Sequence, residues 1–147
     1  MSKSSGWVAV DLDGCLAHYD GWKGVEHIGE PIIMVRDYVK NLIDNGVEVR
    51  IFTARVQEGE KAILPIQKWC YKHLGKSLDV TDRKDMDMVC IIDDRALNPM
   101  TNLKWIQDWD TNHWDIVHVP LPPAEILIAT IKRHWDDPNA PPLSFKK

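Results

Sequence analysis

Long apolar runs, a surplus of positive charge and closely spaced cysteine pairs are all missing from this sequence of 147 residues. No stretch approaches the roughly 18 apolar residues of a membrane helix, and the N-terminus, MSKSSGWVAV, lacks the apolar centre of a signal peptide, so we expect a cytoplasmic protein. The 18 basic and 22 acidic residues give a net charge of -4. This balance argues against a dedicated nucleic-acid-binding protein, although it leaves room for a local basic patch. The three cysteines are unpaired in the sequence, which indicates a reducing compartment.

The composition that is present is that of an ordinary globular protein. Hydrophobic residues make up 44% of the chain and charged residues 27%, which excludes disordered, coiled-coil and collagen-like classes. At about 150 residues per domain, the length predicts a single domain. We assign this domain to residues 1–135 and expect a C-terminal tail at 136–147, because DDPNAPPLSFKK has the composition of a tail.

Short segments rich in β-branched residues predict strands. There are four of them: Trp7–Val10, Val47–Thr53, Val89–Ile92 and Ile116–Val119. The first and third are compact apolar runs that stop at acidic residues, which is typical of buried parallel strands that enter a loop.

Helical segments separate the predicted strands. An apolar stripe from Val35 to Ile43 predicts a helix whose first turn tolerates Pro31. A second helix is expected from about Glu60 to Leu74, where Pro65 marks either a kink or the true first turn, and a third covers residues 126–134. Strands that alternate with helices predict an α/β fold, a Rossmann-like parallel sheet with helices on both faces.

Acidic and hydroxyl side chains follow three of the predicted strands, at the edge where open parallel sheets bind ligands. They are Asp11, Asp13, Thr53, Asp93 and Asp94. Carboxylates gathered in a partly buried site repel one another unless a cation is bound, and oxygen ligands select a hard ion such as Mg²⁺, which completes its shell with phosphate. The sequence therefore predicts a phosphoryl site, to which Thr53 offers a hydroxyl and Lys84 a positive charge.

These residues resemble, in order, the motifs of the haloacid dehalogenase-like (HAD) hydrolase superfamily. Asp11-Leu12-Asp13-Gly14 matches its DxDG motif, Thr53 in VRIFTAR its second motif, Lys84 its third, and Asp93-Asp94 in VCIIDDR its fourth. The resemblance spans about residues 7 to 97.

The resemblance implies a Mg²⁺-dependent phosphatase with a HAD-like fold. It implies that Asp11 is the nucleophile that forms an aspartyl-phosphate and that Asp13 is the general acid and base. Mg²⁺ would be held by Asp11, by the backbone carbonyl of Asp13, and by Asp93 or Asp94 directly or through water. Thr53 and Lys84 would bind the transferring phosphoryl group.

The cap domain that most family members carry is missing. Only residues 15–30 separate the first motif from the next helix, and we interpret them as a short flap in which Tyr19 and Trp22 are candidate substrate contacts. Cys15 stands where the family more often has Thr, and we expect it to pack beside the site. The compact insert and the IIDDR ending are similar to phage-type and polynucleotide-kinase-associated phosphatase domains, which suggests a nucleotide or a nucleic-acid end as the substrate.

Several alternatives stay open on the sequence alone. The chain could be a catalytically silent binding module with the same fold, a small-metabolite (sugar phosphate) phosphatase, or a phosphotransferase. Asp94 could be a helix cap paired to Arg95, and Lys84 a solvated lysine. A homo-oligomer in which a neighbour covers the flap is a further option.

Overall fold

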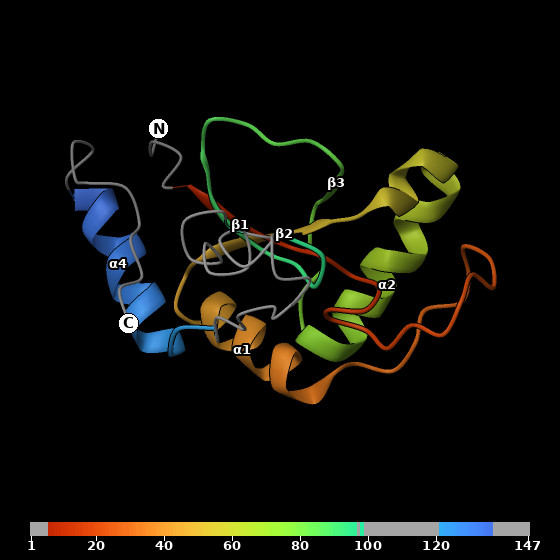
Figure 1. Ribbon diagram of the computed structural model, residues 1–147, viewed down its shortest axis with the longest axis horizontal. Helices are drawn as coiled ribbons and strands as arrows, with labels where there is room; N and C mark the ends of the chain where they lie inside the picture. The colour runs from red at the N-terminus through yellow and green to blue at the C-terminus, as the bar shows by residue number, and fades with distance from the viewer. Residues whose placement is uncertain (1–5, 97, 99–120, 137–147) are drawn as a thin grey trace, which may run out of the picture.

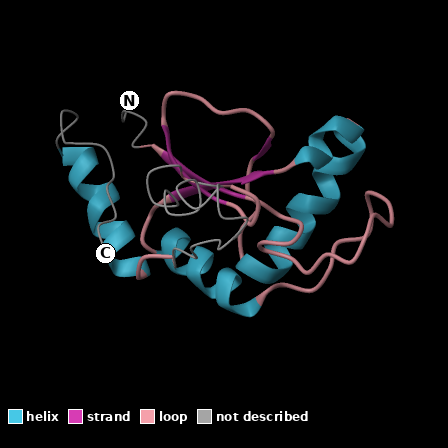
Figure 2. Ribbon diagram, in the orientation of Figure 1, coloured by secondary structure: helices cyan, strands magenta, loops and turns pink. Residues whose placement is uncertain are grey.

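The computed structural model describes residues 6–96, 98 and 121–136. Within them lies a four-stranded parallel sheet of order β3-β2-β1-β4 (Figures 1 and 2). Its strands are β1 (Trp7–Val10), β2 (Glu48–Phe52), β3 (Val80–Thr81) and β4 (Met88–Ile92). The α/β class predicted from the sequence is confirmed at this level.

The two faces of the sheet differ in polarity. In β2, Val49 and Ile51 are buried, whereas Glu48 is exposed and Arg50 partly so. Because parallel partners point to the same side, the register of Val49 with Val8 and of Ile51 with Val10 gives one face a continuous apolar layer. This face packs on the helices and forms the core together with residues such as Leu42, Ile66 and Ile131.

Three helices cover that apolar face: α1 (Ile33–Asp44), α2 (Ile63–Leu74) and α4 (Ala124–Asp136). The central helix, α1, contacts both α2 and α4, so the three lie on one side of the sheet (Figure 2). The Tyr38 hydroxyl donates to the carbonyl of Pro122 at 2.8 Å and joins α1 to the segment that begins α4. Among the described residues, no helix is long and apolar enough to cross a membrane.

The expected helices on both faces are not found among the described residues. The connection 82–87 between β3 and β4 crosses the second face of the sheet (Figure 1). There Asp85 accepts hydrogen bonds from Trp7 and Arg50. This connection is too short to form a crossover helix. The edge strand β3 was not predicted, because Val80–Thr81 contains only two residues and has no readable alternation.

The ends of the predicted elements shift by a few residues. Helix α2 begins at Ile63 rather than Glu60, because the preceding residues form two short 3-10 turns, η1 (Ala54–Glu58) and η2 (Glu60–Ala62). Pro65 consequently lies in the first turn of α2, where it causes no kink. The predicted strand 116–119 and the tail beyond Asp136 lie outside the described residues.

Candidate functional site

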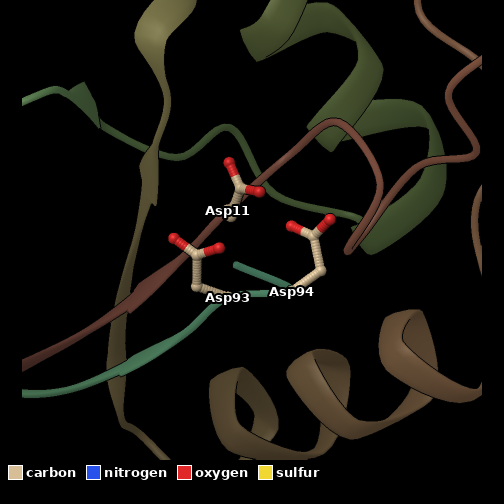
Figure 3. Close-up of side chains that lie close together, drawn as sticks. All are labelled: Asp11, Asp93 and Asp94. Atoms are coloured by element: carbon tan, nitrogen blue, oxygen red, sulfur yellow. The ribbon is translucent and has the colours of Figure 1, made fainter. Parts of the chain in front are cut away.

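Three carboxylates converge where β1 and β4 end. Asp11 follows β1, and Asp93 and Asp94 follow the neighbouring strand β4 (Figure 3). The backbone N–H of Asp11 donates to the carbonyl of Ile92 at 2.9 Å, which holds the two strand ends together. One oxygen from each carboxylate lies within 4.8 Å of the others. The predicted gathering of these three aspartates is therefore present.

The crowding of negative charge changes the acidity of Asp11. Burial, a hydrogen bond with Asp94 and the charges of Asp93 and Asp94 raise the pKa of Asp11 from 3.8 to about 7. A cation bound between the carboxylates would relieve this repulsion. An all-oxygen donor set of this kind fits a hard divalent ion, and it lacks the nitrogen and sulfur ligands typical of zinc.

The backbone conformation and the surroundings of Gly14 explain why the DxDG sequence ends in glycine. Gly14 has a φ of 81°, a backbone conformation that other residues rarely adopt. A Cβ atom at this position would also lie 2.8 Å from an Asp94 carboxylate oxygen. Gly14 therefore allows the loop after β1 to turn sharply and to approach Asp94 closely.

A cavity of about 440 Å³ opens beside the carboxylates. Its lining includes six predicted site residues, Asp11, Asp13, Tyr19, Trp22, Thr53 and Asp93, together with Phe52, Ala54, Arg55, Gln57, Glu58 and Arg95. The structure thus brings most of the predicted residues to one hollow. Asp94 does not line the cavity but belongs to the carboxylate group.

Thr53 is positioned by the turn that follows β2. Its side chain is buried and its hydroxyl oxygen accepts a hydrogen bond from the N–H of Arg55 at 3.2 Å. Its own N–H donates to the carbonyl of Thr81, so both the main chain and the side chain are fixed. The hydroxyl proton can then be donated to a ligand in the cavity.

The Asp13 carboxylate has a partner that the sequence analysis missed. Arg55 Nε and Nη2 donate to the two carboxylate oxygens, each at 2.8 Å. The cluster of carboxylate oxygens consists of Asp11, Asp93 and Asp94 and does not include Asp13. Only the backbone carbonyl of Asp13, as the resemblance implied, would serve as a metal ligand. The missed signal was an arginine two residues after Thr53, in a turn that carried no apolar pattern.

The structure does not bring Lys84 to the cavity, so its assignment as a phosphate ligand is not supported. Lys84 is exposed, and its neighbour Asp85 binds Trp7 at the start of β1, whereas Asp11 follows the end of that strand. The short connection after β3 carries Lys84 along the second face of the sheet. Among the described residues, the cations that line the cavity are Arg55 and Arg95, and the sequence analysis assigned neither to the site.

The alternative in which Asp94 is a helix cap paired to Arg95 is not found in the described part of the structure. The N–H of Arg95 donates to Asp93 at 2.8 Å, and the salt bridges found among the described residues include none from Asp94. This geometry leaves Asp94 directed at Asp11 and Gly14, as the raised pKa and the close approach indicate.

Cys15 packs beneath the site. Its thiol donates to the carbonyl of Ile92 at 3.6 Å. Burial and the charges of Asp11, Asp94 and Asp93 raise its pKa to about 12. The thiolate is the nucleophilic form of cysteine, so a thiol with so high a pKa is unreactive at neutral pH. This supports the packing role expected from the sequence.

Residues 15–30 contain no helix, and two of them, Tyr19 and Trp22, line the cavity. Tyr19 and Trp22 are 44% and 48% exposed, so their rings present a large apolar surface at the cavity mouth. Trp69 Nε1 donates to the carbonyl of Gly29 at 2.9 Å and ties the end of this segment to α2. We keep the name flap for this segment, residues 15–30.

Comparisons with known proteins add a likeness of fold. No family model matches the chain, and no curated protein matches it. A solved structure of a conserved protein coded by a locus of Bacteroides thetaiotaomicron superposes with a TM-score of 0.51 at 19% sequence identity. The match covers 92% of this chain and 98% of that one. At this identity the likeness concerns the fold alone, over nearly the whole of both chains.

Proposed function

We propose that this protein is a Mg²⁺-dependent phosphomonoester hydrolase of the HAD type, acting through an aspartyl-phosphate on Asp11. One observation carries the proposal: a single cavity holds Asp11, Asp13, Thr53 and Asp93, with Asp94 in the same carboxylate cluster. This is the combination of nucleophile, acid and base, hydroxyl donor and metal ligands that the two-step reaction needs.

The cation site consists of residues from two strand ends. Asp11, Asp93 or Asp94, and the backbone carbonyl of Asp13 would hold the ion. When bound, a divalent cation offsets the negative charge of the carboxylates and of the phosphoryl oxygens. The raised pKa of Asp11 supports such a site, since this crowding of carboxylates is unfavourable for the chain alone.

The residues of the chain divide the chemistry between them. A carboxylate oxygen of Asp11 attacks phosphorus, the bond to the leaving oxygen breaks, and Asp13 transfers a proton to that oxygen. Water then attacks the aspartyl-phosphate, Asp13 accepts its proton, and Asp11 and inorganic phosphate are released. The Thr53 hydroxyl donates to a phosphoryl oxygen. Arg95, whose guanidinium enters no salt bridge among the described residues, supplies the cationic charge first assigned to Lys84.

The cavity supports a substrate with an aromatic group next to its phosphate. Tyr19, Trp22 and Phe52 all line it, and stacking on such rings tolerates any nucleobase. A larger substrate would also exclude water from a site that the short flap leaves open. We therefore favour a nucleotide or the phosphorylated end of a nucleic acid over a small sugar phosphate.

The test is a turnover screen in Mg²⁺ over p-nitrophenyl phosphate, nucleotides, sugar phosphates and 3′- or 5′-phosphorylated oligonucleotides. We expect release of phosphate, fastest with a substrate that contains a nucleobase. Asp44→Asn is the matched control, since Asp44 is an exposed aspartate at the end of α1 and remote from the cavity lining. Absence of turnover on every ester would refute the enzyme and favour the silent binding module. A sugar phosphate as the best substrate would refute only the substrate class.

A further inference from the structure

The buried guanidinium of Arg55 joins the proposed acid to the flap. Arg55 is only 5% exposed, and it and Thr53 are the buried polar side chains of the described residues. Besides its two bonds to Asp13, Arg55 Nη2 donates to the carbonyl of His27 at 3.0 Å and Nη1 to that of Val25 at 3.5 Å. Its guanidinium carbon also lies 4.9 Å from the centre of the Trp22 ring.

The hydrogen bonds of Arg55 distinguish between two roles: binding a ligand in the cavity and positioning other groups of the protein. A guanidinium has five N–H donors, and the four hydrogen bonds to Asp13, Val25 and His27 account for four of them. Arg55, although it lines the cavity, therefore makes most of its polar contacts with the protein and has one N–H group left for a ligand. Its partners are the carboxylate of the acid and the main chain of the flap.

We infer that Arg55 is a positioning residue: it fixes the plane and direction of the Asp13 carboxylate and makes that placement depend on the contact of Arg55 with flap residues 22–27. This rests on the proposed function. Two parallel N–H···O bonds fix a carboxylate in its plane, which a single ammonium cannot do. The guanidinium is held on its other sides by the ring of Trp22 and the carbonyls of Val25 and His27. The flap therefore fixes the position of Asp13 through Arg55.

The inference predicts a specific pattern of lost activity. In the first half of the reaction, Asp13 protonates the leaving oxygen as its bond to phosphorus breaks. A leaving group that is a stronger acid needs this proton less, so a misplaced Asp13 slows p-nitrophenyl phosphate less than phenyl phosphate. The two esters share an aromatic ring of the same size, which keeps contacts with Trp22 and Tyr19 similar.

The experiment compares kcat/KM for these two esters in wild-type protein and in Arg55→Lys, which retains the positive charge but loses the planar fork. We expect a loss of about 10²-fold or more on phenyl phosphate, and a loss at least 10-fold smaller on p-nitrophenyl phosphate. The inhibition constant of inorganic phosphate should change by less than about 3-fold, because Arg55 is not expected to bind the phosphoryl group in the ground state. In the Asp13→Asn background, Arg55→Lys should add little, because Arg55 would act through the carboxyl already removed.

Other outcomes separate the ways in which the inference can fail. Equal losses on both esters with weaker inhibition by phosphate would show that Arg55 binds the phosphoryl group. Equal losses without that weakening, or full additivity with Asp13→Asn, would leave it a structural residue. Trp22→Leu replaces Arg55→Lys if circular dichroism and thermal melting show that Arg55→Lys does not fold, because the Trp22 side chain is half-exposed. Trp22→Leu should also lose more kcat/KM on phenyl phosphate than on p-nitrophenyl phosphate, by a smaller factor. No turnover of these two esters or of any other ester in the screen by wild-type protein would refute the proposed function itself.

Discussion

Two arginines of this protein lie against tryptophan rings, and their surroundings differ in an instructive way. On the second face of the sheet, the guanidinium of Arg50 lies 4.4 Å from the ring centre of Trp7. At the carboxyl ends of the strands, that of Arg55 lies 4.9 Å from the ring centre of Trp22. Both pairs are cation–π contacts of similar geometry. The carboxylates beside them distinguish the two regions.

Around Arg50 the acidic residues have partners. Asp85 accepts from Trp7 Nε1 at 2.8 Å and from Arg50 at 3.4 Å, and these bonds lower its pKa. Glu48 pairs with Arg50 at 2.7 Å. Around Arg55, Asp13 is paired, whereas the neighbouring cluster of carboxylates raises the pKa of Asp11 to about 7. Paired carboxylates of the first kind hold a fold together, whereas crowded ones of the second kind mark a site for a cation and for chemistry.

The largest expected effect is the loss of turnover in Asp11→Asn. An amide cannot attack phosphorus to form the covalent intermediate, so we expect no activity above background. The same substitution on the second face, Asp85→Asn, should lower the melting temperature but keep kcat/KM on p-nitrophenyl phosphate within about 3-fold, the range of a surface substitution. Equal kinetic losses in the two variants would remove the distinction between the regions.

Asp13→Asn should come next, slowing turnover by roughly 10² to 10⁴ through loss of the general acid and base. Metal binding should persist, since the backbone carbonyl is retained. Steady-state kinetics and Mg²⁺ titration followed by thermal melting measure the two properties. A loss of Mg²⁺ affinity as large as the loss of kcat would contradict the separation of Asp13 from the carboxylate cluster.

Metal removal tests the crowded cluster directly. Excess EDTA should abolish turnover and Mg²⁺ should restore it, whereas Ca²⁺ should bind and inhibit because its looser shell of 6 to 8 oxygens disturbs the attack geometry of Asp11. At about 100 times Kd, Mg²⁺ should stabilise the fold by about 2.7 kcal/mol, or roughly 5–10 °C in Tm. The double variant of Asp93→Asn with Asp94→Asn should lose this shift. Full activity in EDTA would refute the metal site.

A smaller effect is expected at the cavity mouth. Trp22→Ala should raise KM for a nucleotide-sized substrate by about 5- to 150-fold, which corresponds to the roughly 1–3 kcal/mol of one base stacked on an aromatic ring. KM for a minimal alkyl phosphate should change far less. Equal changes in both KM values would show that Trp22 does not act by stacking on a base.

The last effect concerns stability rather than turnover, and it depends on pH in the presence of EDTA. Because the pKa of Asp11 is about 7 in the folded protein and 3.8 is its ordinary value, the folded state binds a proton that the unfolded chain gives up. The corresponding stability is complete below pH 3.8 and is lost as pH rises through about 7. Asp11→Asn should therefore raise Tm relative to wild type at pH 8 but not at pH 4, by about 2–4 °C for each 1 kcal/mol. A difference that does not depend on pH would contradict the raised pKa.

The sequence alone was enough to predict β1, β2, β4, the three helices and the carboxylate cluster. An apolar run that stops at Asp11 and another that stops at Asp93 indicate neighbouring parallel strands, whose ends meet at one edge. The predicted helix end at Leu74 is the observed end of α2, where Gly75 follows with a φ of 78°. These features depend on local periodicity and on the order of residues along the chain, which a sequence states directly.

Only the tertiary structure decided the partner of Asp13 and the place of Lys84. Arg55 and Asp13 are far apart in the chain, and their pairing depends on where the turn after β2 directs a long side chain. Lys84 was predicted to bind phosphate because it precedes the last acidic motif. The connection after β3 runs along the second face of the sheet, however, and places Lys84 away from the cavity. Spacing specifies which residues share an edge of a sheet, but side-chain direction and the path of a short connection follow from packing across the whole fold.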